Sequence, residues 1–439
     1  MDLLSKAYAT ASDDDDDVDD SKGSRTWNSL PPPPPPPLQH KRSRPEVLLE
    51  QPMPVYRCPL PPEAPMPGRY ISKRQRAALS VDSTVAEKNL TTQNPSPGSL
   101  LDSDVPHSIL KILRHHVKGG VVSNQTPQEF SAALNGHTKA VNAVQWSGSH
   151  SHLIASAGMD HTVRIWNVWS SSKRQARILN CHNAAVKDVI WSPQGLSVLS
   201  CGYDCTSRLV DVEKGIETHV FKEDQVVEVV KFSPNNYNLF LSGGSKGRLK
   251  LWDIRTGTVV HEYIRNLGPI LDVEFTVDGK HLITSSDVSR SNLSENAILV
   301  WDVSRQVPLS NQVYAEAYTC PCIRRHPFEP YFIAQSNGNY MAIFSTRAPY
   351  KLDKYKRYEG HGVSGFPIKC NFSLDGEVVA SGSNDGCIYF YNSKTSKLMK
   401  KVKAFEQACI DIVFHPILPD IVACCSWQGE VSVFHQKLK

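Results

Sequence analysis

From about residue 130 onward, short segments of alternating apolar and polar residues follow one another at a regular interval. Within residues 141–167 an apolar stretch is followed by a turn, the small-residue segment LIASA, the tight turn GMD and the alternating segment TVRIW. Period-two alternation bounded by turn residues is typical of β-strands. Because this order recurs along the chain, it predicts an all-β structure built from repeats.

The spacing of the repeats predicts how many there are. Each repeat closes on a bulky residue near the end of its third strand, and successive closing residues lie 42 to 49 positions apart. They are Trp166, Val210, Trp252, Trp301, Phe344, Tyr391 and Phe434. A repeat of roughly 40 to 45 residues holding four strands is typical of a propeller blade. The pattern therefore predicts a seven-bladed β-propeller over residues 129–439.

The repeats resemble those of the WD-repeat β-propeller family. The segments LWDIRTGTVVHEYIRNLGPI and YKRYEGHGVSGFPIKCNFSLDG are most similar to the branch that holds pre-mRNA-processing factor seventeen and WD-repeat-containing protein twenty-five. The resemblance implies a hydrogen-bonded His, Ser, Asp and Trp set within a blade. The matching residues are His137, Ser156, Asp160 and Trp166, then His182, Ser200 and Asp204, then His361, Ser381 and Asp385. A His and Asp pair is also found in catalytic triads, but its recurrence indicates an architectural role.

Residues 129–134, with the sequence EFSAAL, precede the first repeat and form a short strand pattern of their own. Propellers remove exposed sheet edges by pairing an early strand with the last blade. We expect this strand to lie beside the final segment GEVSVFHQ and to close the ring.

The first 128 residues differ in kind from the repeats. They hold 19 of the 30 prolines together with an acidic run at Asp13–Asp20. Such a composition buries too little apolar surface to fold, so we expect residues 1–102 to be disordered. Residues 103–128 form a third region, in which Asp104 and Pro106 fit a helix start and Gly119 a helix end. This amphipathic helix either packs on its own chain or binds a partner.

Two features of the first region are candidate recognition elements. The basic clusters at Lys41, Arg42 and Arg44 and at Lys73, Arg74 and Arg76 fit nuclear import signals, or charge that solvates a tail. The seven prolines Pro31–Pro37 predict a left-handed rod that serves as a spacer or occupies a WW or SH3 module.

The overall composition limits the kinds of ligand and reaction that we expect for this chain. The net charge of +4 does not indicate nucleic-acid binding by the whole surface, so any RNA contact is local. No apolar run reaches the length of a membrane helix, and eleven scattered cysteines favour free thiols in a reducing compartment. Cys320 with Cys322 and Cys201 with Cys205 lack the second pair that a zinc site needs. We expect no enzymatic activity, cofactor or metal.

The resemblance implies a nuclear scaffold that holds proteins of a multi-subunit assembly connected with pre-mRNA splicing, with a cytoplasmic pool left open. An alternative interpretation rests on Trp252, Asp253 and Arg255, which fit the WD-x-Arg pattern of propellers that resemble substrate receptors of cullin-four ubiquitin ligases. In that case Arg255 would contact the ligase adaptor. The competing explanation is an arginine in a solvated turn that pairs with a neighbouring carboxylate.

Overall fold

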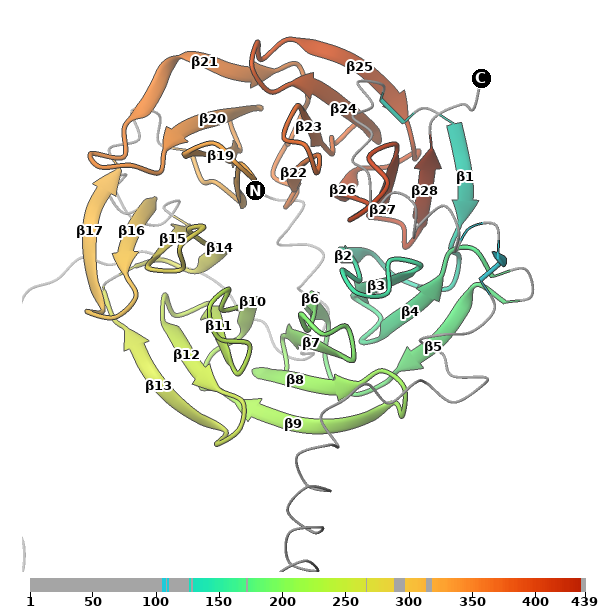
Figure 1. Cartoon of the computed structure of the whole chain (residues 1–439), viewed down its shortest axis with the longest axis horizontal. Helices are drawn as coiled ribbons and strands as arrows, with labels where there is room; N and C mark the ends of the chain where they lie inside the picture. The colour runs from blue at the N-terminus through green and yellow to red at the C-terminus, as the bar shows by residue number, and fades with distance from the viewer. Residues whose placement is uncertain are drawn as a thin grey trace, which may run out of the picture. The chain divides into compact units, whose positions relative to one another are not determined.

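The computed structural model describes residues 105–107, 109, 126–127, 129–170, 173–265, 267–287, 297–312 and 318–435. Within these ranges the strands form seven four-stranded antiparallel sheets, arranged as the blades of a ring (Figure 1). The seven-bladed propeller predicted from the repeat spacing is therefore confirmed.

Each blade runs from an inner strand at the ring centre to an outer strand at its rim. The strands are, for blade 1, β2 (Val141–Trp146), β3 (Leu153–Gly158), β4 (Val163–Asn167) and β5 (Gln175–Leu179); for blade 2, β6 (Val186–Trp191), β7 (Ser197–Gly202), β8 (Thr206–Asp211) and β9 (Ile216–Lys222); for blade 3, β10 (Val227–Phe232), β11 (Leu239–Gly244), β12 (Leu249–Asp253) and β13 (Thr258–Tyr263); for blade 4, β14 (Ile270–Phe275), β15 (His281–Ser286), β16 (Ile298–Asp302) and β17 (Val307–Gln312); for blade 5, β18 (Cys322–Arg325), β19 (Tyr331–Ser336), β20 (Tyr340–Ser345) and β21 (Leu352–Glu359); for blade 6, β22 (Cys370–Phe372), β23 (Val378–Ser381), β24 (Cys387–Asn392) and β25 (Leu398–Lys403); and for blade 7, β26 (Cys409–Phe414), β27 (Ile421–Ser426), β28 (Val431–His435) and β1 (Glu129–Ala133).

The second strands of blades 1, 2 and 3 are rich in small residues and almost fully buried. All six residues of β3, with the sequence LIASAG, are buried. At the end of β7, a Cβ on Gly202 would collide with the carbonyl oxygen of Ala185. At Gly202 the small residue therefore reflects close approach of the chain just before β6 of the same blade.

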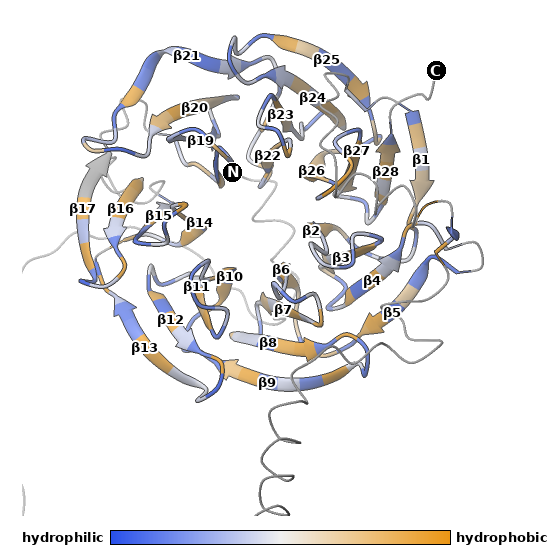
Figure 2. Cartoon of the chain, viewed as in Figure 1, coloured by the Kyte–Doolittle hydropathy of each residue, from blue (hydrophilic) through white to orange (hydrophobic). Residues whose placement is uncertain are grey.

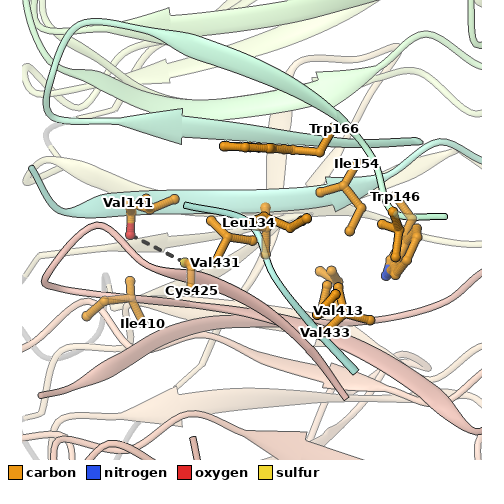
Figure 3. Packing of buried hydrophobic residues seen from close by; sticks show 14 of the residues in the cluster. Leu134, Val141, Trp146, Ile154, Trp166, Ile410, Val413, Cys425, Val431 and Val433 are labelled. Carbon is orange, nitrogen blue, oxygen red and sulfur yellow. Dashed lines mark hydrogen bonds between the residues drawn. The ribbon is translucent and has the colours of Figure 1, made fainter. Parts of the chain in front are cut away.

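The hydrophobic core is divided among the blade interfaces. One cluster joins blades 7 and 1, where Val413 and Val433 lie near Trp146 and Ile154 (Figure 3). In the same cluster the Cys425 thiol donates a hydrogen bond to the Val141 carbonyl oxygen at 3.4 Å. Because each interface buries its own set of side chains, the stability of the ring depends on every blade having both neighbours.

Strand β1 closes the ring, as the sequence predicts. It pairs antiparallel with β28, with Ala132 opposite Val433 and Ala133 opposite Ser432. The Leu134 amide donates to the Val431 carbonyl at 2.8 Å, and the Leu134 side chain is 1% exposed within the core cluster. The first strand and the last strands of the propeller therefore share one sheet.

Several expectations fall outside the described residues. These are the disordered region 1–102 and nearly all of the helix expected in residues 104–119. The division of the chain at residues 102 and 128 stays a prediction.

Blade 5 lacks the His, Ser, Asp and Trp set, yet β18 to β21 form a complete sheet there. Strand alternation and burial are therefore enough to build a blade.

Candidate functional site

The inner strands of all seven blades surround a central channel that holds a cavity of about 350 Å³. Charged side chains of both signs line this cavity. They are Lys187, Asp188, Glu228, Lys231, Asp272, Arg324, Lys369 and Asp411. We call this set the hub charges.

Lys369, just before β22 in blade 6, connects two of the hub carboxylates. Its Nζ lies 3.6 Å from Asp188 Oδ1 of blade 2 and 3.6 Å from Asp411 Oδ2 of blade 7. Burial by itself would lower the pKa of Lys369, but the carboxylates of Asp411 and Asp188 outweigh it and raise that pKa above its ordinary value. The lysine is therefore charged at neutral pH, as its two partners require.

Arg324 and Asp272 form a second pair in the hub. Arg324 Nη1 lies 2.6 Å from Asp272 Oδ2. Burial by itself would raise the pKa of Asp272, but the Arg324 charge outweighs burial and lowers it. Asp272 therefore stays ionised although its side chain is almost fully buried.

The hub aspartates also join neighbouring blades through the backbone. Each accepts a hydrogen bond from a main-chain N–H on the inner strand of the next blade. The bonds are Val230 N–H to Asp188 Oδ2 at 3.4 Å, Ile323 N–H to Asp272 Oδ2 at 2.8 Å and Val144 N–H to Asp411 Oδ2 at 3.1 Å. The three hub aspartates therefore tie blade 2 to 3, 4 to 5 and 7 to 1.

The residues of blade 1 that resemble the family set form a continuous chain of hydrogen bonds. His137 Nδ1 lies 3.0 Å from Asp160 Oδ2, His137 Nε2 lies 2.8 Å from Ser156 Oγ, and Trp166 Nε1–H donates to Ser156 Oγ at 2.8 Å. Burial raises the pKa of Asp160, but the bonds and charge of His137 outweigh it and bring it well below its usual range. The ionised Asp160 therefore accepts from His137 Nδ1–H, while His137 Nε2 and the Ser156 hydroxyl share the second bond. Ser156 is fully buried and its oxygen also accepts from the Trp166 indole, so the set lies inside the blade, out of reach of a substrate.

Ser156→Ala is expected to lower the free energy of unfolding by about 1 to 3 kcal/mol, because it leaves Trp166 Nε1–H and His137 Nε2 buried without a partner. Chemical denaturation measures the loss. Ser207→Ala is the matched control, since the Ser207 hydroxyl is buried and has no hydrogen-bond partner. An equal loss in both variants would show that the bonds of Ser156 do not stabilise the blade.

Blade 2 repeats the arrangement without the tryptophan. His182 Nδ1 lies 3.0 Å from Asp204 Oδ2, and His182 Nε2 lies 2.8 Å from Ser200 Oγ. Val210 is buried where blade 1 has Trp166. The His, Ser and Asp bonds therefore do not need the indole ring.

Blade 6 differs from the expectation drawn from the resemblance. His361 Nδ1 bonds with the Tyr391 hydroxyl at 2.9 Å, and His361 Nε2 lies 2.6 Å from Gln335 Nε2 of blade 5. Ser381 donates to the Gly382 carbonyl, and Asp385 pairs with Lys401. The phenol of Tyr391 replaces the indole and takes the His361 nitrogen that faces the aspartate in blade 1. Burial lowers the pKa of His361 to about 4, so the ring is neutral.

Blade 3 keeps the tryptophan but replaces the histidine with a glutamate that sequence comparison of the repeats missed. Trp252 Nε1–H donates to Ser242 Oγ at 3.0 Å, and Ser242 donates to Glu223 Oε1 at 2.6 Å. Lys246, at the usual aspartate position, lies 3.4 Å from Asp224 instead. The signal available in the sequence was an acidic residue at the position where other blades have His.

Arg255 follows Trp252 and Asp253 in the turn after β12. Its side chain is 65% exposed, and its Nη2 lies 2.8 Å from Asp253 Oδ2 while its Nε donates to Asp253 Oδ1 at 3.2 Å. This two-point bond holds the pKa of Asp253 below and that of Arg255 above their ordinary values. The guanidinium therefore has a partner within its own turn.

The loops between the first and second strands of each blade lie on one face of the ring, which we call the hairpin face. They are residues 147–152, 192–196, 233–238, 276–280, 326–330, 373–377 and 415–420. Neighbouring loops are bonded to one another: His415 Nε2–H donates to the Ser151 carbonyl, and His326 Nε2–H donates to the Gly376 carbonyl. Sequence analysis did not single out these two histidines. The side chains of these two histidines hold the loops of neighbouring blades against each other.

Five successive blades present an exposed apolar side chain on the hairpin face. Phe328 is 73% exposed and Val277 is 65% exposed. The full set, which we call the apolar arc, is Leu196, Tyr237, Val277, Phe328 and Leu374. The arc thus offers one apolar side chain on each of five successive blades as a possible contact for a broad partner that spans them.

The remaining sequence candidates lie outside the described residues. They are the basic clusters Lys41, Arg42, Arg44 and Lys73, Arg74, Arg76, and the prolines Pro31–Pro37. Among the described residues no group of three or more His, Cys, Asp or Glu side chains could hold a metal ion. In the same ranges no helix is long and apolar enough to cross a membrane. The ten described cysteines are free thiols.

Comparison with known proteins identifies the repeats. The family described as WD domain, G-beta repeat matches residues 128–167, 173–211, 215–253 and 353–392. WD repeat-containing protein 25 of Mus musculus is 33% identical over 364 residues, which cover 79% of this chain and 68% of that protein. Pre-mRNA-processing factor 17 of Homo sapiens is 31% identical over 310 residues, 70% of this chain and 52% of that protein.

A third relative is Pre-mRNA-processing factor 17 of Saccharomyces cerevisiae, 26% identical over 312 residues that cover 70% of this chain and 67% of that protein. The chain thus spans about half the length of the human factor, and the matched region has room for the whole ring. Together with the seven blades and the tryptophan bonds of blades 1 and 3, this similarity shows that the chain belongs to the WD-repeat β-propeller family.

Proposed function

We propose that this protein is a nuclear scaffold that holds other proteins within an assembly for pre-mRNA processing, in particular splicing. The observation that carries the proposal is its similarity, over the region that holds the propeller, to proteins named for pre-mRNA processing. The basic clusters at residues 41–44 and 73–76 fit the import that a nuclear role needs.

The geometry supports docking rather than catalysis as the work of the ring. The His, Ser and Asp sets of blades 1 and 2 use their polar atoms within their own blade. The apolar arc, by contrast, leaves large side chains in water on one face. Burying such side chains against a partner is the main source of binding energy in protein interfaces. We therefore assign partner binding to the hairpin face.

The alternative function as a ligase substrate receptor depends on Arg255. Its bond with Asp253 matches the competing explanation of an arginine held in a solvated turn. An adaptor would have to share or displace Asp253 to bind the guanidinium. The ligase interpretation stays a prediction that the following experiment decides.

Affinity purification of the full-length protein with mass spectrometry and RNA sequencing tests the proposal. The wild type is expected to retain pre-mRNA-processing proteins and small nuclear RNAs. A triple variant of the apolar arc, Val277→Ser, Phe328→Ser and Leu374→Ser, is expected to lose at least tenfold of those proteins, because each side chain would no longer be buried by the partner.

The matched control removes three exposed apolar side chains from outer strands, Ile216→Ser, Val220→Ser and Val260→Ser. It is expected to keep the partners. Arg255→Ala is expected to keep them as well. Recovery of a ligase adaptor that disappears in Arg255→Ala would favour the alternative, and equal recovery by the arc variant and wild type would contradict docking on the hairpin face.

A further inference from the structure

The positive charge of this protein is concentrated in one segment. Residues 347–403 carry eleven Lys and Arg and five Asp and Glu, whereas the net charge of the whole chain is only +4. The net positive charge of this segment therefore exceeds the net charge of the entire protein. Near neutrality of the whole chain conceals a local basic region.

The structure places most of this charge on the outer strands of two neighbouring blades. Strand β21 carries Lys354, Lys356 and Arg357, and β25 carries Lys400, Lys401 and Lys403. Both strands lie on the rim of the ring, and hydrophilic residues make up most of β21 (Figure 2). The loops before these strands add Lys351, Lys394 and Lys397. We call these nine residues the basic rim.

The two halves of the basic rim are in contact. Lys356 Nζ of blade 5 donates to the Lys394 carbonyl of blade 6 at 3.4 Å. Lys351, Lys356 and Lys394 also line one cavity between the blades, of about 470 Å³. The two halves of the basic rim therefore meet at the interface of blades 5 and 6, in a cavity that Glu329 and Asp353 also line.

Only part of the basic rim is neutralised within the protein. Lys394 pairs with Glu377, Lys401 with Asp385, Arg357 with Glu359 and Lys403 with Glu406. Lys351, Lys354, Lys397 and Lys400 make no ion pair with any described residue. Like charges on one rim repel one another, so these four lysines add no electrostatic stabilisation to the described part of the fold. An anionic ligand would remove that repulsion.

The sequence of β21 places an exposed aromatic residue between two lysines of the basic rim. Tyr355, between Lys354 and Lys356 on β21, is 97% exposed, more than any other large hydrophobic side chain among the described residues. A ring so fully in water does not contribute to the core. Exposed aromatic rings beside lysines are the elements that bind single-stranded nucleic acid, because bases stack on the ring while the lysines contact phosphates.

We propose that the basic rim binds single-stranded RNA, with Tyr355 as a stacking platform and Lys354, Lys397 and Lys400 as phosphate contacts. The inference deepens the proposed function, on which it rests for the source of the RNA. An acidic protein would also be attracted by the lysines, but Asp and Glu side chains carry no ring that stacks on Tyr355, whereas every nucleotide carries one beside its phosphate. The aromatic residue therefore favours RNA.

Fluorescence anisotropy of the purified full-length protein with a labelled 20-nucleotide oligouridylate tests the proposal. The triple variant Lys354→Ala, Lys397→Ala and Lys400→Ala is expected to bind at least tenfold more weakly. Affinity falls as salt rises, and each lost phosphate contact makes the slope of log affinity against log salt shallower by about 0.7. Loss of three contacts makes it shallower by about 2. Tyr355→Ala is expected to bind about tenfold more weakly with an unchanged slope, and Tyr355→Phe is expected to restore binding.

The control variant removes the same charge elsewhere on the propeller, with Lys173→Ala, Lys222→Ala and Lys280→Ala, whose lysines are also exposed. It is expected to bind like the wild type. Equal losses in the two triple variants, or no binding by the wild type, would overturn the proposal. Displacement of RNA by polyglutamate at equal charge, combined with full binding by Tyr355→Ala, would instead identify an acidic-protein site. Because this assay uses the purified chain, its result is independent of which partners the scaffold retains.

Discussion

Deletion of residues 129–134 from the full-length protein is expected to lower its melting temperature by about 10 °C or more and to cause aggregation. The deletion removes β1 and Leu134, so β28 loses its hydrogen-bonded neighbour and the core between blades 7 and 1 loses a buried leucine. Loss of one buried leucine costs about 2 to 5 kcal/mol, and the lost strand pairing adds to this. In domains of roughly 150 to 250 residues each 1 kcal/mol shifts the melting temperature by about 2 to 4 °C.

Differential scanning fluorimetry and size-exclusion chromatography measure the two effects. The length-matched control is deletion of residues 120–125, just upstream of the closing strand. It is expected to melt like the wild type and to remain monodisperse. A wild-type melting temperature after deletion of 129–134 would mean that the ring does not need β1.

Lys369→Met is expected to lower the free energy of unfolding at pH 7 by about 2 to 3 kcal/mol. The substitution keeps the length of the side chain but leaves Asp188 and Asp411 without the cation between them. Breaking a buried ion pair costs about 3 to 5 kcal/mol, and we take a lower figure because 18% of the Lys369 side chain is exposed to the channel. Urea denaturation measures the loss.

The loss should depend on pH in a defined direction. Lys369 has a raised pKa, so its contribution is fully present at pH 7 and is lost only at high pH. Burial raises the pKa of Asp411 although Lys369 opposes this, so removing the lysine raises that pKa further. A buried carboxyl with a raised pKa destabilises the fold while it is ionised, and this cost disappears as it protonates. The difference between wild type and variant should therefore shrink as pH falls from 7 toward 4.

Two further variants separate the charge effect from packing. Lys369→Met with Asp411→Asn is expected to recover part of the stability, since the uncompensated carboxylate is gone. Lys280→Met, at an exposed lysine, is expected to change stability by less than about 0.5 kcal/mol. A deficit in Lys369→Met that stays constant with pH would contradict an electrostatic role of this lysine in the hub.

The fold could be predicted from the sequence because its information is local and repeated. Period-two alternation, turn residues and the spacing of the closing residues occur within each blade, and seven copies reinforce one another. The closing strand at residues 129–134 was also predictable, because a sheet edge in an open ring needs a partner. The departures in blades 2, 3 and 5 did not prevent blade formation, since the strands are set by burial rather than by the polar set.

The polar contacts between blades could not be predicted in the same way. Lys369 meets Asp188 across the channel, and no local pattern records a pairing between residues so far apart in the sequence. Glu223 replaces a histidine in blade 3, and Gln335 reaches His361 from a neighbouring blade. These substitutions preserve the hydrogen bonds while changing the residue types, so a search for the same letters misses them.

The basic rim and the apolar arc could be identified only from the structure. Net charge counted over the chain argues only against nucleic-acid binding by the whole surface and cannot locate a local site, whereas the fold brings the lysines of β21 and β25 onto one rim. The apolar arc likewise takes single residues from five separate loops. Each looks ordinary in its own repeat, and only the common direction of the hairpin loops gathers them on one face.

The closed ring, on which both proposed surfaces depend, is tested most directly by a register-specific cross-link. Residues directly opposite each other in antiparallel strands have Cβ atoms about 4.5 to 5.5 Å apart, within reach of a disulfide after small adjustments. In the full-length protein, Ala133→Cys with Ser432→Cys is therefore expected to form an intramolecular disulfide, detected by peptide mass spectrometry. Ala133→Cys with His435→Cys, three residues out of register, is expected to form none. A cross-link only between two molecules, or equal cross-linking of both pairs, would contradict closure of the ring by β1 and β28.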